Sequence, residues 1–121
     1  MQGRTRRRTG FRSTLRRAGA VTWIDPRRAI VARASGRGDI ELREFSLPAD
    51  ADERRYGLGD VARELGGPDP VVFIGPESDR AALEREFVSV FRRPDRIEDI
   101  EPSGPMTRAD LVAMLRERLG S

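Results

Sequence analysis

Four consecutive apolar residues, Val71-Val72-Phe73-Ile74, lie between two stretches of helical periodicity. The run does not alternate with polar residues, which predicts a strand covered on both faces. Before it, one helical stripe is formed by Leu58, Val61, Ala62 and Leu65, and Gly66-Gly67-Pro68 ends that helix. After it, Gly75-Pro76 opens a helix with an inner row of Leu83, Phe87 and Phe91, backed by Val88 and Val90. A buried strand between helices predicts an α/β sheet with helices on its faces.

Three further apolar runs precede this unit. Residues 20–24 predict a strand that ends at Asp25-Pro26, and residues 28–34 and 40–47 predict two more, joined by a turn at residues 35–39. In the third run the apolar residues change face between Leu42 and Phe45, which predicts a bulge or fraying near Arg43-Glu44. Residues 48–57 are polar and acidic, and this composition predicts a loop.

The C-terminal part contains a fifth strand and a third helix. Residues 97–101 predict the strand, and Thr107 with Asp110 predicts a helix cap, with Met106 and Leu111 as its hydrophobic staple. The apolar face of this helix is formed by Leu111, Val112, Leu115 and Leu119. The order is then three strands, a helix, a strand, a helix, a strand and a helix.

This order predicts one α/β domain over residues 18–121, with a mixed five-stranded sheet and three helices. The strand order is 3-2-1-4-5, the ribonuclease-H-like order, with the first strand central and parallel to the fourth. We expect Trp23 and Phe73 to be well buried on these two strands. Phe87 and Leu115 are expected to pack on the sheet.

Residue counts exclude most catalytic chemistry. The chain of 121 residues has no cysteine and no histidine, which excludes disulfides, zinc fingers, cysteine nucleophiles and histidine general bases. No apolar run approaches the roughly 20 residues that span a bilayer. All 23 basic residues are arginine. Residues 1–17 hold seven arginines and no acid, whereas residues 18–121 hold 16 arginines and 20 acids.

The N-terminal segment, residues 1–17, therefore predicts a basic, disordered arm. Its candidate nucleic-acid-binding residues are Arg4, Arg6, Arg7, Arg8, Arg12, Arg16 and Arg17. These would neutralise RNA phosphates, with Phe11 available to stack on a base. A solvated tail, residues upstream of the true start and a mitochondrial transit peptide are the alternatives. Arg6-Arg7 also resembles a twin-arginine export signal, but no apolar stretch follows it.

A ribonuclease-H-like sheet raises the possibility of a two-metal nuclease, which needs several converging carboxylates. The candidates are Asp25, Glu64, Glu77 and Asp79. The alternative is that Asp25 forms a turn and that Glu77 and Asp79 stabilise a helix N-terminus. The junction Gly75-Pro76 is interpreted as structural, because acids rather than a glycine-rich loop follow it. No metal or cofactor is expected.

Three segments carry a resemblance to a known family: residues 21–25 (VTWID) with Ala29-Ile30, residues 71–76 (VVFIGP) and residues 111–119. In order and spacing, residues 20–119 resemble small bacterial translational machinery proteins. Those proteins resemble the central domain of the archaeo-eukaryotic class I release factors and of pelota.

In the release factors, a Gly-Gly-Gln loop between the third strand and the first helix promotes peptidyl-tRNA hydrolysis. The corresponding stretch here, residues 48–57, contains no such triplet, and Gly66-Gly67 lies after the helix. The family's codon-reading and partner-binding domains are not expected either. The resemblance therefore implies a non-catalytic, cytoplasmic protein that binds the ribosome or another structured RNA. The alternatives are a protein-binding adaptor of the same fold and a degenerate nuclease.

Overall fold

The computed structural model describes residues 19–34, 39–66, 71–92, 97–100 and 104–120. Its elements, in chain order, are β1 (Gly19–Ile24), β2 (Arg28–Ala34), β3 (Ile40–Ser46), α2 (Ala51–Glu64), β4 (Val71–Ile74), α3 (Glu77–Phe91), β5 (Ile97–Ile100) and α4 (Arg108–Gly120). Three expected features lie partly outside the described residues: the turn at residues 35–39 at positions 35–38, the helix stop at Gly67-Pro68, and the fifth strand at Glu101.

The predicted topology is confirmed. The five strands form one sheet in the order β3-β2-β1-β4-β5. β1 pairs antiparallel with β2 and parallel with β4, so that Val21 lies between Ala32 and Val72. β2 and β3 are antiparallel, whereas β4 and β5 are parallel. The fold is an α/β fold with three helices in the described residues.

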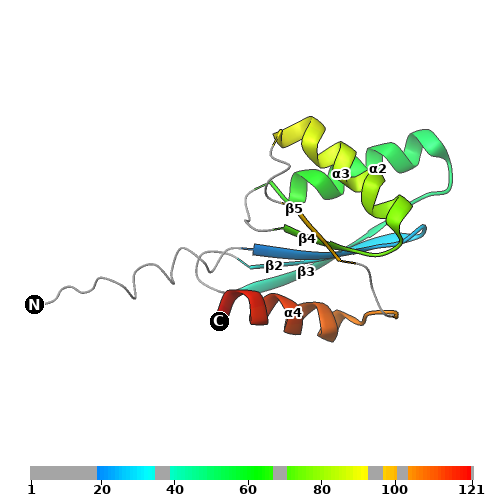
Figure 1. Ribbon diagram of the computed structural model, residues 1–121. Helices are drawn as coiled ribbons and strands as arrows, with labels where there is room; N and C mark the ends of the chain where they lie inside the picture. Colours follow the sequence, from blue (N-terminus) through cyan, green and yellow to red (C-terminus); the bar gives the residue numbers. More distant parts are fainter. Residues whose placement is uncertain (1–18, 35–38, 67–70, 93–96, 101–103, 121) are drawn as a thin grey trace, which may run out of the picture.

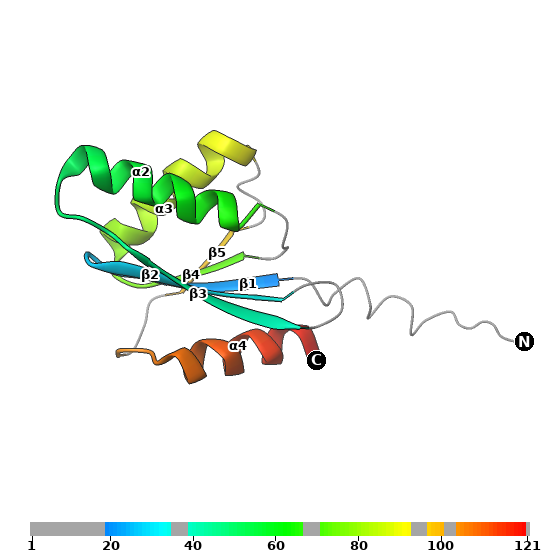
Figure 2. The ribbon, with the colours of Figure 1, turned by 180° about the vertical axis from the view of Figure 1, so that it is seen from behind.

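Helices cover both faces of the sheet. α2 and α3 lie side by side on one face, and α4 lies alone on the other (Figure 1 and, from behind, Figure 2). Successive residues of β4 serve the two cores: Val71 and Phe73 pack under α2 and α3, whereas Val72 and Ile74 pack against α4. This double burial explains why β4 is apolar without alternation.

The bulge predicted near Arg43-Glu44 is wrong. β3 pairs with β2 without interruption, from Ile40 opposite Ala34 to Ser46 opposite Arg28. Ile40 packs on the α4 face and Phe45 on the α2 face, as residues of opposite parity must in a regular strand. The apolar residues of β3 change face because the start of the strand packs on the α4 layer and its end packs on the α2 layer.

The loop predicted over residues 48–57 is also wrong beyond Asp50, because α2 begins at Ala51. Asp50 is the N-cap, and its carboxylate accepts hydrogen bonds from the backbone N–H groups of Asp52 and Glu53. The first two turns lie largely in solvent, so they carry no apolar stripe. The cap stabilises this segment as a helix despite its polar composition.

The other two helices follow the expected pattern with one exception. Leu83 and Phe87 of α3 are fully buried, but Val90 is 44% exposed and does not back the inner row. The cap of α4 is reciprocal: Asp110 N–H donates to Thr107 Oγ1 and Thr107 N–H donates to Asp110 Oδ2, at 3.1 and 2.9 Å. These hydrogen bonds lower the pKa of Asp110.

Gly75 joins β4 to α3 at a position that only glycine fits. Its φ is +147°, and an added Cβ would lie 1.9 Å from the carbonyl oxygen of Ile24, at the end of β1. The close approach of these two strand ends therefore depends on the missing side chain.

Trp23 differs from expectation in its burial. Phe73 is fully buried as predicted, but Trp23 is only half-buried on the α4 face. Its indole Nε1–H donates to Asp25 Oδ2 at 2.8 Å, so the polar edge of the ring faces the rim of the sheet. Within the part of the chain that the structure describes, no helix is long and apolar enough to cross a membrane.

Candidate functional site

Asp25, the first of the nuclease candidates, closes the turn between β1 and β2. Its carboxylate accepts hydrogen bonds from Trp23 Nε1–H and from the backbone N–H groups of Arg27 and Arg28, at 2.8, 2.8 and 3.0 Å. Partial burial raises the pKa of Asp25, but these hydrogen bonds and the charge of Arg28 together lower it below its ordinary value. The carboxylate is ionised and committed to the turn.

Asp79 lies near the same end of the sheet, where Arg54 of α2 holds it. Arg54 Nη2 donates to Asp79 Oδ1 at 2.8 Å, and Arg54 Nη1 donates to the carbonyl oxygen of Pro26 at 2.6 Å. One guanidinium thus ties α2, α3 and the β1–β2 turn together. Glu77, in the first turn of α3, is exposed.

Glu64 lies at the opposite end of the sheet from Asp25. It pairs with Arg43 at 2.6 Å and with Arg33 at 3.5 Å, and Arg33 lies opposite Ala20 at the start of β1. Asp25 follows the end of the same strand. The four candidate carboxylates therefore do not converge, and no three acidic side chains in the described segments form a group that could hold a metal ion.

A group of charged side chains between α3 and β5 is not among the residues predicted from the sequence. Arg80 is 9% exposed; its Nε–H donates to the Gly75 carbonyl at 2.7 Å, and its Nη1 lies 3.8 Å from Asp99 Oδ1. A hydrogen bond with Asp99, partial burial and the Asp99 charge raise the pKa of Glu84 to about 7, against the lowering effect of Arg80. Helical spacing of Arg80 and Glu84 puts them on one side of α3, but the sequence did not show that Asp99 faces them.

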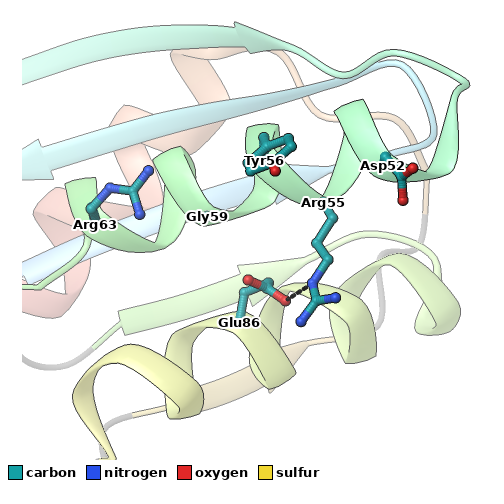
Figure 3. Close-up of a pocket in the computed structure, with 6 residues that line it drawn as sticks. All are labelled: Asp52, Arg55, Tyr56, Gly59, Arg63 and Glu86. Carbon is teal, nitrogen blue, oxygen red and sulfur yellow. Dashed lines mark ion pairs between the residues drawn. The ribbon is translucent and has the colours of Figure 1, made fainter.

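The described surface also has a hollow between α2 and α3 (Figure 3), with a volume of about 460 Å³. Its lining residues are Asp52, Arg55, Tyr56, Gly59, Arg63 and Glu86. Tyr56 is 77% exposed, and Gly59 leaves the helix surface beside it without a side chain. Arg55 Nε lies 3.6 Å from Glu86 Oε2, which links the two helices across the hollow.

The arrangement in the hollow is suited to contact rather than to chemistry. Exposed tyrosine and arginine side chains are the types enriched at protein interfaces. The hollow carries two arginines and two carboxylates, so its lining charges balance. Tyr56 is not among the predicted site residues, because its polar surroundings predict a loop. The N-cap at Asp50, which places Tyr56 on a helix, is the signal that could have found it.

Residues 48–57, which the expected resemblance aligns with the release-factor loop, form no projecting loop. Only Pro48, Ala49 and Asp50 separate Leu47 from α2, and residues 51–57 form the first two turns of that helix. Gly66 has a packing role, since an added Cβ would lie 2.4 Å from the ring of Phe91.

The predicted nucleic-acid-binding arginines, from Arg4 to Arg17, lie outside the described residues. No protein-family model matches the chain, and no curated protein sequence matches it significantly. The resemblance to the release-factor central domain therefore stays an expectation that rests on the three sequence segments.

Proposed function

We propose that this protein is a non-catalytic, cytoplasmic RNA-binding protein of the translation machinery, whose N-terminal arginines hold it on the ribosome or another structured RNA. The observation that carries the proposal is how the chain distributes its charge. Residues 1–17 have seven arginines and no acid, whereas residues 18–121 have more acids than arginines.

Inside the domain, arginines on most elements have carboxylate partners within 4 Å. The paired arginines are Arg28, Arg33, Arg43, Arg54, Arg55, Arg63, Arg80, Arg108 and Arg118. A paired guanidinium gains less from a phosphate, because it must first give up its carboxylate. The concentrated, unbalanced positive charge of the chain is thus at its N-terminus.

Arginines in this setting bind RNA chiefly by releasing condensed counterions. Each phosphate neutralised contributes a salt slope of about −0.7 on single strands. With about five phosphates engaged, affinity falls roughly a hundredfold between 50 and 200 mM salt. The remaining domain, with a net charge of −4, contributes little to this term.

The non-catalytic part of the proposal is supported by what the candidate side chains already do. Asp25 forms a turn, while Asp79 and Glu64 form ion pairs with Arg54 and Arg43. The stretch at residues 48–57 lacks the Gly-Gly-Gln triplet and is largely helical. Peptidyl-tRNA hydrolysis and metal-dependent cleavage of RNA are both expected to be absent.

The test is co-sedimentation with ribosomes over a range of salt, using the full-length chain. The seven arginines are replaced together by glutamine in one variant and by lysine in a matched control. We expect the glutamine variant, and a chain starting at Gly19, to lose at least tenfold in affinity, and the lysine variant to keep most of it. Equal binding and equal salt slopes for all four proteins would rule the proposal out.

The protein-binding adaptor is the second candidate, favoured by the exposure of Tyr56 beside Arg55. The same assay distinguishes it. An adaptor that binds a ribosomal protein through α2 keeps its affinity when the N-terminal arginines become glutamines and loses it in Tyr56→Ala. The arm-dependent protein shows the reverse pattern.

A further inference from the structure

The outer edge of β3 is a long, regular and exposed strand edge. β3 is an end strand of the sheet (Figure 2), and residues 41–44 are all exposed. It contains no proline and no bulge, two of the devices that prevent an edge strand from pairing with another chain. Its charged residues, Glu41, Arg43 and Glu44, restrict pairing to a strand of complementary charge. This edge can therefore accept another strand.

The hydrogen bonds to β2 determine which residues face outward. Leu47 N–H donates to the Arg27 carbonyl at 2.7 Å, and hydrogen-bonded pairs alternate along an antiparallel ladder. The N–H and C=O groups of Glu41, Arg43 and Phe45 therefore point toward β2. Those of Ile40, Leu42, Glu44 and Ser46 point toward the free edge.

We propose that two copies of this chain form a symmetric dimer by antiparallel pairing of their β3 strands, centred on Leu42. The two strands can form hydrogen bonds only when outward-facing residues of one copy lie opposite outward-facing residues of the other. Three symmetric registers near the middle of the strand meet this condition. One places Glu41 opposite Glu41 and another places Arg43 opposite Arg43, and both oppose like charges. The third places Leu42 opposite Leu42 and Glu41 opposite Arg43, twice.

The Leu42 register is favourable on both faces of the sheet. On the α4 face, the two Leu42 side chains, each 42% exposed in one copy, meet at the twofold axis. On the α2 face, each Glu41 lies opposite Arg43 of the second copy at a non-hydrogen-bonded position, where side chains approach most closely. Opposite charges at such positions stabilise pairing, and like charges oppose it.

Ion pairs within each copy extend these contacts. Glu41 Oε1 lies 3.7 Å from Arg33 Nη2, and Arg43 Nη1 lies 2.6 Å from Glu64 Oε1. Arg43 is also held over the ring of Phe45, 4.9 Å from its centroid. Dimerisation would join the pairs into two rows of alternating charge, Arg33–Glu41–Arg43–Glu64, that cross from one copy to the other.

The other edge of the sheet lacks this self-complementarity. β5 has adjacent acids, Glu98 and Asp99, and no basic residue. A register that centres β5 on itself opposes like charges. The charge pattern therefore selects β3, and a second copy of the same chain, as the pairing partners. This inference is independent of the proposed RNA binding.

The test is sedimentation equilibrium of the ribonuclease-treated, full-length protein over a range of concentrations. We expect a monomer–dimer equilibrium for the natural chain. Glu41→Arg and Arg43→Glu should each raise the dissociation constant on the order of tenfold, because both cross-strand pairs become repulsive. An equimolar mixture of the two variants should restore the dimer, since each cross-strand pair then joins an arginine of one variant to a glutamate of the other.

A backbone variant tests the pairing without changing charge. Leu42→Pro removes an outward-facing N–H that β2 does not use, so the domain stays folded and the dimer is lost. Arg85→Glu on α3 is the charge-reversal control, and it should leave the equilibrium unchanged. A natural chain that is monomeric at every concentration overturns the proposal. So does a dimer that survives Leu42→Pro, or a mixture of the two charge variants that does not associate.

Discussion

β4 and β3 belong to the same sheet but have opposite relations to solvent. β4 is four residues long, has no polar side chain and is buried on both faces. β3 is seven residues long; five of its residues are exposed, and three of these are charged. A central strand is constrained by two packed layers, whereas an end strand is constrained only through β2 and at its ends. The residues free to make external contacts are therefore those of the end strand.

The largest expected difference between β4 and β3 is in how much the free energy of unfolding falls when an apolar side chain is truncated to alanine. Phe73→Ala should lower the free energy of unfolding by about 3–5 kcal/mol, because it removes a fully buried ring. This ring packs edge-on against Phe87, with 6.1 Å between the two ring centroids. Leu42→Ala should cost less than about 1 kcal/mol in the monomer. Urea denaturation measures both, and equal losses would contradict the distinction between the strands.

The next largest differences in stability are expected at the junctions that follow β4 and β3. β4 reaches α3 through Gly75, and Gly75→Ala should cost about 3 kcal/mol, because it combines a disfavoured φ with a clash against the Ile24 carbonyl. Gly104→Ala is the matched control, since an added Cβ there meets nothing within 4 Å. Its effect should stay within about 0.5 kcal/mol. Similar melting temperatures for both variants would contradict the close approach of β1 and β4.

β3 reaches α2 through a side-chain cap instead. Asp50→Ala should cost about 1 kcal/mol, because two backbone N–H groups lose their acceptor. Asp52→Ala, which loses only a favourable charge in the first turn, should cost roughly 0.5 kcal/mol or less. Chemical denaturation compares them, and an equal cost would show that the cap does not hold this junction.

The smallest effect concerns β5, the other end strand, whose Asp99 turns toward α3. The pKa of Glu84 is about 7 in the folded protein, above its unfolded value of 4.5. The folded state then binds more protons, so stability should fall as pH rises from about 4.5 to about 7. Solvent screening limits the change to about 1 kcal/mol. Thermal melts should show this slope in the natural chain and not in Glu84→Gln; a parallel slope would place its origin elsewhere.

Strands and buried helix faces could be predicted from the sequence, because apolar spacing reports burial directly. Val71–Ile74 and the row of Leu83 and Phe87 are clear examples. The first turns of α2 were missed, because a solvent-exposed helix leaves no apolar stripe and depends on the cap at Asp50. The regular course of β3 was missed because its two ends pack on different layers.

Charged contacts between distant segments could not be predicted. Spacing does not show that Arg54 reaches the Pro26 carbonyl, or that Arg43 reaches Glu64. Such pairs depend on how α2 lies over the sheet. They also engage two of the candidate carboxylates, since Arg54 holds Asp79 and Arg43 holds Glu64 at opposite ends of the sheet.

The parallel pairing of β1 with β4 has a consequence for the order in which the chain folds during synthesis. β1, β2 and β3 form contacts between neighbouring segments, so this meander can assemble as soon as it leaves the ribosome. Val21 must wait for its second neighbour, Val72, which lies 51 positions further along the chain and 26 beyond Ser46 at the end of β3. Until then the inner edge of β1 is open as well as the outer edge of β3. During this interval, the nascent chain is most exposed to mispairing with other chains.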